Sequence, residues 1–187
     1  MVTIRNETRR DIAAREQLLD RVWGAARFAK TAERLREDRL PAERLSFAAA
    51  EDGRLVGTVR LWHVYAGPDR PALLLGPLAI DAAWRGRGIG SALVRHAMAA
   101  AGRREHPAVL LVGDAEFYGR FGFSAEKTGA LWLPGPYERH RLLGYELLPG
   151  ALDDARGLVG PTGQAAPMPS PDAFIAHITH SRAPRAA

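Results

Sequence analysis

One stretch near the middle of this 187-residue chain constrains its fold more than any other. In LLLGPLAIDAAWRGRGIGSALVRHAM, an apolar strand runs into a turn with glycine at alternate positions, and the turn opens a helix. Gly86, Gly88 and Gly90 allow the backbone to approach a ligand closely and to adopt positive φ. The first amides of a helix lack partners within it, and the helix dipole favours an anion there. Because Arg85 and Arg87 add two positive charges, the segment predicts a pyrophosphate-binding site.

The glycine spacing separates this site from two other phosphate-binding loops. A dinucleotide-binding loop has the pattern G-x-G-x-x-G directly after the first strand, whereas this chain has G-x-G-x-G in mid-chain. The Gly-Lys-Ser/Thr ending of a nucleoside-triphosphate loop is missing as well. The remaining alternative is a plain glycine-rich turn before a helix. Three alternating glycines together with two arginines are more than such a turn requires.

The flanking segments predict an α/β fold with a mixed, mostly antiparallel sheet. A hairpin turn at residues 51–54 implies antiparallel pairing, and the strand–helix–strand unit from Leu73 to Val112 implies a parallel pair. Gly76 and Pro77 interrupt the strand before the glycine turn; since proline cannot donate to a ladder, this strand should bulge or lose pairing there. We expect strands at 2–5, 45–50, 55–65, 73–81, 108–112 and 142–148, a return strand beginning at Gly122-Phe123, and helices at 8–26, 30–39, 91–101 and 115–120.

Composition excludes several classes of protein. There is no cysteine, which excludes disulfides, thiolate metal sites and a cysteine nucleophile. No apolar run approaches the length of a transmembrane helix, and the charged N-terminus has no signal-peptide core, so we expect a cytoplasmic protein that does not contact membranes. The charge of +5 comes from 24 Arg and 2 Lys that are scattered among acids, so we expect no nucleic-acid partner.

Two motifs resemble those of one enzyme family. The segment Arg85 to Gly90 resembles the R/Q-x-x-G-x-G/A coenzyme A motif of the GNAT (GCN5-related) N-acetyltransferases, and Pro77 to Ile80 resembles that family's fourth strand. Further on, Phe117 to Phe123 is similar to its F-Y-x-x-x-G-F segment. The ending LLGYELLPGALDDARG is similar to a subgroup of predicted bacterial acetyltransferases often called YhbS-like.

The resemblance implies an acyl-CoA N-acyltransferase fold whose two central parallel strands splay apart around pantetheine. Residues 1–150 would form the GNAT domain, and 151–187 a Pro/Gly-rich C-terminal tail, docked or flexible, with Phe174, Ile175 and Ile178 as docking residues. Acetyl-CoA would be the co-substrate, with no metal. The amide of Leu78 or Ala79 would polarise the thioester carbonyl. The implied coenzyme-binding residues are Leu78, Ala79, Ile80, Arg85, Gly86, Arg87, Gly88, Ile89, Gly90, Ser91 and Phe117.

The family tyrosine that protonates the departing thiol corresponds to Tyr118. Its alternative role is that of a core aromatic among three phenylalanines. For the base we select Asp114, which could instead contact the coenzyme or cap the helix that follows it. His63 is a further candidate and a plausible core histidine, Glu116 is a solvated first-turn acid, and water is a possible proton relay.

The expected activity is direct transfer of an acetyl group to a primary amine of a small molecule or peptide. The absence of cysteine excludes an acetyl-cysteine intermediate. The acceptor is not readable from the sequence, and the apolar loop from Thr128 to Leu142 should line a pocket or a homodimer contact. The alternative is a non-catalytic acyl-CoA-binding sensor, supported by the lack of an acid in the strand before the glycine turn. The Pro-rich tail predicts that a chain ending at Gly150 keeps its affinity for CoA.

Overall fold

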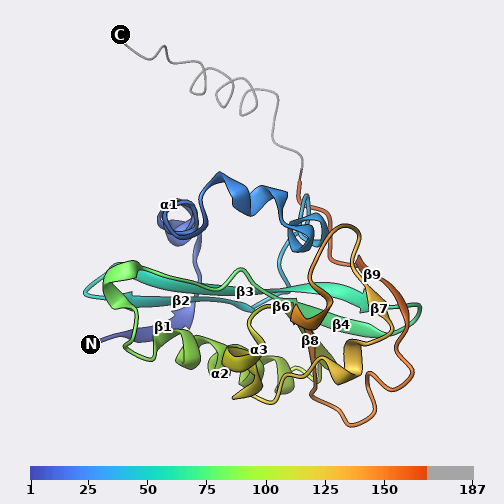
Figure 1. The fold of residues 1–187 in the computed structure, drawn as a ribbon. Helices are drawn as coiled ribbons and strands as arrows, with labels where there is room; N and C mark the ends of the chain where they lie inside the picture. The colour runs from blue at the N-terminus through green and yellow to red at the C-terminus, as the bar shows by residue number, and fades with distance from the viewer. Residues whose placement is uncertain (168–187) are drawn as a thin grey trace.

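The computed structural model describes residues 1–167, which form a sheet with helices on both faces (Figure 1). The strands are β1 (Thr3–Asn6), β2 (Ser46–Glu51), β3 (Arg54–Ala66), β4 (Pro71–Leu75), β5 (Ala79–Ile80), β6 (Ala108–Val112), β7 (Leu131–Trp132), β8 (Leu142–Glu146) and β9 (Gly157–Pro161). The α-helices are α1 (Ile12–Trp23), α2 (Ile89–Gly102) and α3 (Ala115–Gly119), and two 3-10 helices, η2 (Ala25–Ala29) and η3 (Thr31–Leu35), follow α1.

Strand β3 organises the sheet because it is long enough to pair twice along each edge. On one edge it pairs with β2 through residues 54–60 and with β9 through residues 64–66. On the other edge it pairs with β5 at Gly57 and Thr58 and with β4 through residues 61–65. Strand β4 in turn pairs in parallel with β6, which pairs with β8. The mixed sheet with one central parallel pair confirms the predicted fold class.

The helices divide the core between the two faces of the sheet. Helix α1 and the 3-10 helices lie on one face, and α2 and α3 lie on the other (Figure 1). Helix α2 buries Leu93, Val94 and Ala97 against β2, β3 and β6. Helix α1 buries Leu18 and Leu19 on the opposite face. With both faces covered, the central strands are apolar on both sides, as the sequence of β3 predicted.

The expected interruption at Gly76-Pro77 is a change of register. In β4, Leu75 lies opposite Leu61 of β3. Continuing that register would bring Ala79 opposite Gly57, but Ile80 lies there instead. One extra residue is therefore accommodated at the break, as in a β-bulge. After the break the chain continues as β5, which pairs with β3 and not with β6. The parallel pair of β4 and β6 therefore ends at the break, and the two chains diverge.

Some expected elements differ in the structure. The helix predicted over residues 30–39 is a 3-10 helix, η3, confined to Thr31–Leu35. The return strand expected at Gly122-Phe123 is absent; this part of the described chain makes only an isolated bridge between Ser124 and Gly144. Strand β7 was not expected, and neither was β9, which pairs with both β3 and β7.

Residues 151–167, which the sequence placed in a tail, contain strand β9. Val159 of this strand is fully buried, and Leu152 and Ala155 before it are 2% and 6% exposed. All three belong to the core on the α1 face of the sheet. The docking residues expected at Phe174, Ile175 and Ile178 lie outside the described residues.

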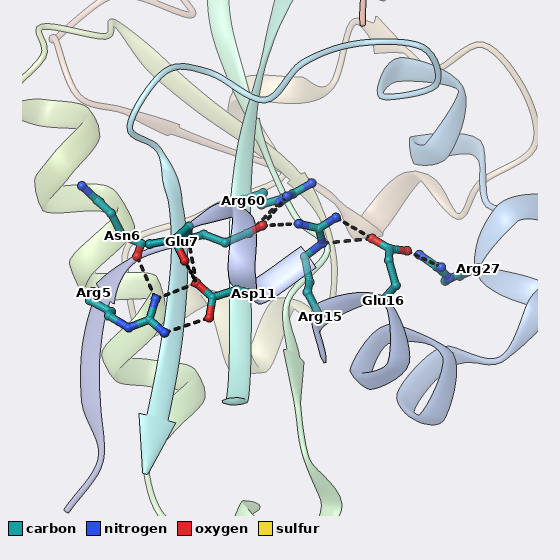
Figure 2. Close-up of polar contacts among 9 residues, drawn as sticks. Arg5, Asn6, Glu7, Asp11, Arg15, Glu16, Arg27 and Arg60 are labelled. Carbon is teal, nitrogen blue, oxygen red and sulfur yellow. Dashed lines mark hydrogen bonds and ion pairs between the residues drawn. The ribbon is translucent and has the colours of Figure 1, made fainter. Parts of the chain in front are cut away.

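Charged side chains join α1 to the sheet in a partly buried network (Figure 2). The Glu7 side chain is only 5% exposed and accepts hydrogen bonds from Arg15 of α1 and from Arg60 of β3, with the Arg60 Nε at 2.9 Å. Arg15 also donates to Glu16 at 2.7 Å. Glu16 in turn accepts from Arg27 of η2 at 2.6 Å. The network thus extends from β3 to the segment that follows α1.

We predict that Glu7→Gln destabilises the fold. The substitution leaves Arg15 and Arg60 without their shared counter-charge, and removing one partner of a buried ion pair typically costs about 3–5 kcal/mol. Glu43→Gln is the control, because the Glu43 side chain is 92% exposed and 3.8 Å from Arg44. Urea unfolding should give a lower midpoint for Glu7→Gln only. Equal midpoints for the two variants would show that the network does not stabilise the fold.

Strand β9 changes the expectation for a chain that ends at Gly150. Such a chain lacks β9 and exposes the apolar residues that β9 and Leu152 cover, so we predict a lower melting temperature and less soluble protein. A chain ending at Pro167 retains every described residue and is the control. Equal thermal unfolding of the two truncated chains would support a domain boundary at residue 150.

Candidate active site

A cleft of about 860 Å³ lies where the parallel pair opens. Strands β4 and β6 are paired at Leu73–Val109 and Leu74–Leu110, and their continuations then diverge. The cleft is lined by the strand break, the glycine turn before α2, the end of β6 with α3, the segment following α1, and the 133–141 loop. The motifs that the sequence singled out therefore lie around one cavity.

The backbone at the break is fixed by β3. The Gly76 amide donates to the Arg60 carbonyl at 2.8 Å, and the Trp62 indole donates to the Gly76 carbonyl at 2.6 Å. Beyond the break, the Asp81 amide donates to Val56 at 2.8 Å. Since peptide groups alternate in direction along a strand, the amides of Leu78 and Ile80 then point away from β3.

The three residues of this strand that the sequence predicted to contact the coenzyme therefore differ in their positions. Leu78 and Ile80 line the cleft. Ala79 does not: it lies opposite Thr58 in the β3 register, and its side chain is 1% exposed in the cluster formed with α1. Of the two amides considered for the thioester carbonyl, the geometry favours that of Leu78.

The glycine turn has the predicted positive φ at Gly86 and Gly88 but not at Gly90, which lies inside α2. Gly86 and Gly88 have φ of 76° and 75°, and Gly88 is the N-cap of α2. A Cβ atom at either position would meet no atom within 4 Å, so there is open space beside the turn. The Gly88 carbonyl accepts from Ala92 at 3.0 Å, which leaves the amides of the first helical turn without acceptors inside the helix.

The other turn residues lie in different surroundings. Gly90 packs on the cleft wall, where a Cβ would lie 3.7 Å from Ile80 and 3.8 Å from Phe117. Arg85 lines the cleft and makes no ion pair with residues 1–167. Arg87 is instead 3.1 Å from Glu51. Hydrogen bonds from Trp84 and then from Arg87 lower the pKa of Glu51.

Tyr118 lines the cleft and belongs to an aromatic cluster, so both roles considered for it have structural support. Its ring makes edge contacts with Phe117 and Phe123 at centroid distances of 4.8 and 5.9 Å. Gly113 lets the ring approach β6, because a Cβ there would be 2.3 Å from the Tyr118 Cε2. Burial, with a smaller effect of the Asp114 charge, raises the pKa of Tyr118 to about 12.

Asp114 is the N-cap of α3, one of the alternatives considered for it. Its Oδ1 accepts from the Phe117 amide at 2.8 Å, and the residue also lines the cleft. His63 does not line the cleft; its ring lies 5.4 Å from that of His106. Glu116 is exposed in the first turn of α3.

The wall opposite the glycine turn is formed by the segment following α1 and the 133–141 loop. The Thr31 hydroxyl donates to the Pro136 carbonyl, and Arg34 donates to Pro134 at 2.7 Å, so the two segments are tied together. Pro136 and Tyr137 line the cleft, as expected for a pocket-lining loop, whereas Trp132 is 53% exposed. The sequence did not single out Arg36, which is buried in this wall.

Residues 1–167 contain no group of three or more His, Cys, Asp or Glu side chains that could hold a metal ion. No helix within this range is long and apolar enough to cross a membrane.

Comparison with known proteins gives a consistent picture. The model of the Acetyltransferase (GNAT) family matches residues 12–123. The chain is 30% identical to the uncharacterized N-acetyltransferase YhbS of Escherichia coli K12, over 83% of this chain and 93% of that protein. It also resembles the crystal structure of E. coli YhbS in complex with CoA, with a TM-score of 0.73, 29% identity, and coverage of 86% of this chain and 89% of that one.

A GNAT acetyltransferase from Brucella melitensis in complex with acetyl-CoA shares the fold, with a TM-score of 0.58 and 24% identity over 89% of this chain and 96% of that one. The matched region contains the strand break, the glycine turn and Tyr118, the same segments that surround the cleft. The chain is therefore a member of the GNAT N-acetyltransferase family.

Proposed function

We propose that this protein transfers the acetyl group of acetyl-CoA directly to a primary amine bound in the same cleft. The observation that carries this proposal is the arrangement of three groups around one cavity. Backbone amides without partners lie at the start of α2, the Leu78 and Ile80 backbone forms one wall, and the Tyr118 phenol forms part of another. The CoA-bound structure of E. coli YhbS supports the choice of coenzyme.

The residues at the glycine turn fit a pyrophosphate. The amides from Arg87 to Ser91 would hold it, since anions bind well at a helix N-terminus. Arg85 supplies a charge that no acid among residues 1–167 neutralises, and Gly86 and Gly88 leave the space open. Leu78 and Ile80 would offer backbone groups to pantetheine, with Phe117 and Ile89 beside them. The side chain of Arg87 contributes less, because it already pairs with Glu51.

The reaction needs two proton transfers. The amine nitrogen attacks the thioester carbon, a C–N bond forms, and the C–S bond breaks as the sulfur leaves with its electron pair. The Leu78 amide would stabilise the negative charge that develops on the carbonyl oxygen. Tyr118 would give its proton to the sulfur; with a pKa raised to about 12, the phenol remains protonated throughout the neutral range. Asp114 would accept the amine proton through Oδ2, directly or through water, because Oδ1 is used by the Phe117 amide.

A panel of primary amines, assayed by the release of free thiol from acetyl-CoA, tests this proposal. Acetylation of at least one amine by the wild-type chain is the expected result. Tight binding of CoA in calorimetry without transfer to any amine would instead favour the non-catalytic sensor.

We predict that Tyr118→Phe lowers kcat by about 10² to 10⁴, the usual contribution of one general acid. The ring and its packing are retained, so acetyl-CoA affinity and melting temperature should change little. Because the raised pKa keeps the phenol protonated, wild-type kcat should not fall on the alkaline side below about pH 10 through loss of this proton. Near wild-type turnover of the Phe variant, with chemistry rate-limiting, would assign Tyr118 to packing alone.

We also predict that Gly88→Val weakens CoA binding at least tenfold, because its side chain would fill the space beside the helix amides. Gly53→Val is a matched control: Gly53 has φ of 78° and equally open surroundings, but it lies in the β2–β3 turn and does not line the cleft. Both variants should lose a similar amount of stability, about 1–2 kcal/mol for a side chain in the left-handed region. Calorimetry with CoA should separate them, and equal CoA affinities would contradict the assignment of the glycine turn as the pyrophosphate-binding site.

A further inference from the structure

Arg36 is a buried cation with unused hydrogen-bonding capacity in the cleft wall. It is 8% exposed, and its Nη2 lies 2.7 Å from Glu33 Oε2. Its Nε is fully buried and has no hydrogen-bond partner. Within residues 1–167, Glu33 is the only acid with which it forms an ion pair. A guanidinium carries five N–H donors, and a buried donor without an acceptor is costly, so the side chain is suited to a further acceptor.

The guanidinium lies beside the strand break. Its Nη1 is 3.7 Å from the position that a Cβ would occupy on Gly76. Gly76 is two residues before Leu78, whose amide faces the proposed thioester site. A ligand group bound by Arg36 would therefore lie next to the position of acetyl transfer.

The charges around Arg36 are mostly positive. Lys30 and Arg141 line the same cleft, and neither forms an ion pair with the described residues. Burial, followed by the charges of Arg36 and Arg141, lowers the pKa of Lys30, so both arginines act on Lys30 at this wall.

The acids on this wall offset only part of those charges. Glu33 pairs with Arg36, and Glu138, which lies 3.4 Å from His140, is the other acid that lines this wall beside Lys30, Arg36 and Arg141. Arg27, a fourth cation lining the cleft, is neutralised separately by Glu16 and Asp20. The wall therefore retains an excess of positive charge.

We propose that the acceptor amine carries a second, anionic group, a carboxylate or a phosphate, which binds to Arg36 with Lys30 and Arg141 beside it. The inference rests on the proposed acetyl transfer and adds the class of acceptor. The planar guanidinium fork matches both oxyanions, and a buried Arg that is already held by Glu33 loses little conformational freedom on binding. Such an anchor would hold the amine end of the acceptor near the strand break.

Calorimetry tests the anion site without requiring turnover. The protein is saturated with CoA, which occupies the glycine turn, and is then titrated with inorganic phosphate and, separately, with acetate. We expect one site per chain for at least one of these anions. Arg36→Met should weaken that binding about tenfold or more, and Arg36→Lys should restore part of it. Arg103→Met, an exposed arginine at the end of α2, is the control and should bind like the wild type.

Arg141→Met provides a second variant if Arg36→Met does not fold. Arg141 is exposed, so its substitution should leave the melting temperature unchanged and weaken the anion several-fold. Absence of saturable binding by the wild type would overturn the inference. Unchanged anion affinity in the Arg36 variants would also overturn it. If Arg36→Met does not fold, unchanged anion affinity in Arg141→Met would overturn it instead.

Kinetics distinguish this inference from the proposed function. Acceptors are compared in matched pairs: one pair is a dipeptide with a free or an amidated C-terminus, and the other is an amino alcohol with or without a phosphate. In each pair the wild type should prefer the anionic member at least tenfold in kcat/KM. Arg36→Met should lose this preference while KM for acetyl-CoA stays unchanged. Acetylation of both members with equal kcat/KM would overturn the inference alone. Arg36-dependent anion binding without acetylation of any amine would overturn the proposed function alone.

Discussion

The two hydrogen bonds that hold the Gly76 peptide to β3 are the contacts on which the site depends. They fix the strand at the point where proline removes a donor, so β5 continues along β3 after a one-residue change of register. Strand β6 then loses its parallel neighbour and a cleft opens inside the sheet. The same change of register turns the amides of Leu78 and Ile80 toward the cleft. A regular strand in this place would have paired with β6 and closed it.

The opposite wall is held by charges instead of sheet pairing. Glu7, buried between α1 and β3, begins a series of ion pairs that extends through Arg15 and Glu16 to Arg27 on the cleft wall (Figure 2). Arg60 joins both systems, since its side chain binds Glu7 while its carbonyl accepts from Gly76. The segment proposed to contact the acceptor and the strand break proposed to contact the coenzyme are thus connected through one residue of β3.

The features that could be predicted from the sequence are those that depend on the backbone preferences of neighbouring residues. The glycine turn and the strand break were predictable because each depends on what a Gly or Pro can do to its own backbone. Strands β7 and β9 were not: both are short and lie among glycines and prolines. Strand β9 depends on pairing with β3, which is distant in the chain, and β7 depends on pairing with β9. Arg36 was one of 24 arginines, and its burial is set by tertiary packing. The pairing of Arg87 with Glu51 joins residues 36 positions apart and likewise has no local signal.

A crystal structure of the chain with bound CoA would show whether the opened strand pair holds the coenzyme. We expect pantetheine between β5 and β6, hydrogen-bonded to the backbone of Leu78 and Ile80, and the pyrophosphate at the amides of Ile89, Gly90 and Ser91. The CoA sulfur should then lie within reach of the Tyr118 hydroxyl. A pyrophosphate bound elsewhere, or pantetheine outside the opened strand pair, would rule out this cleft as the coenzyme site.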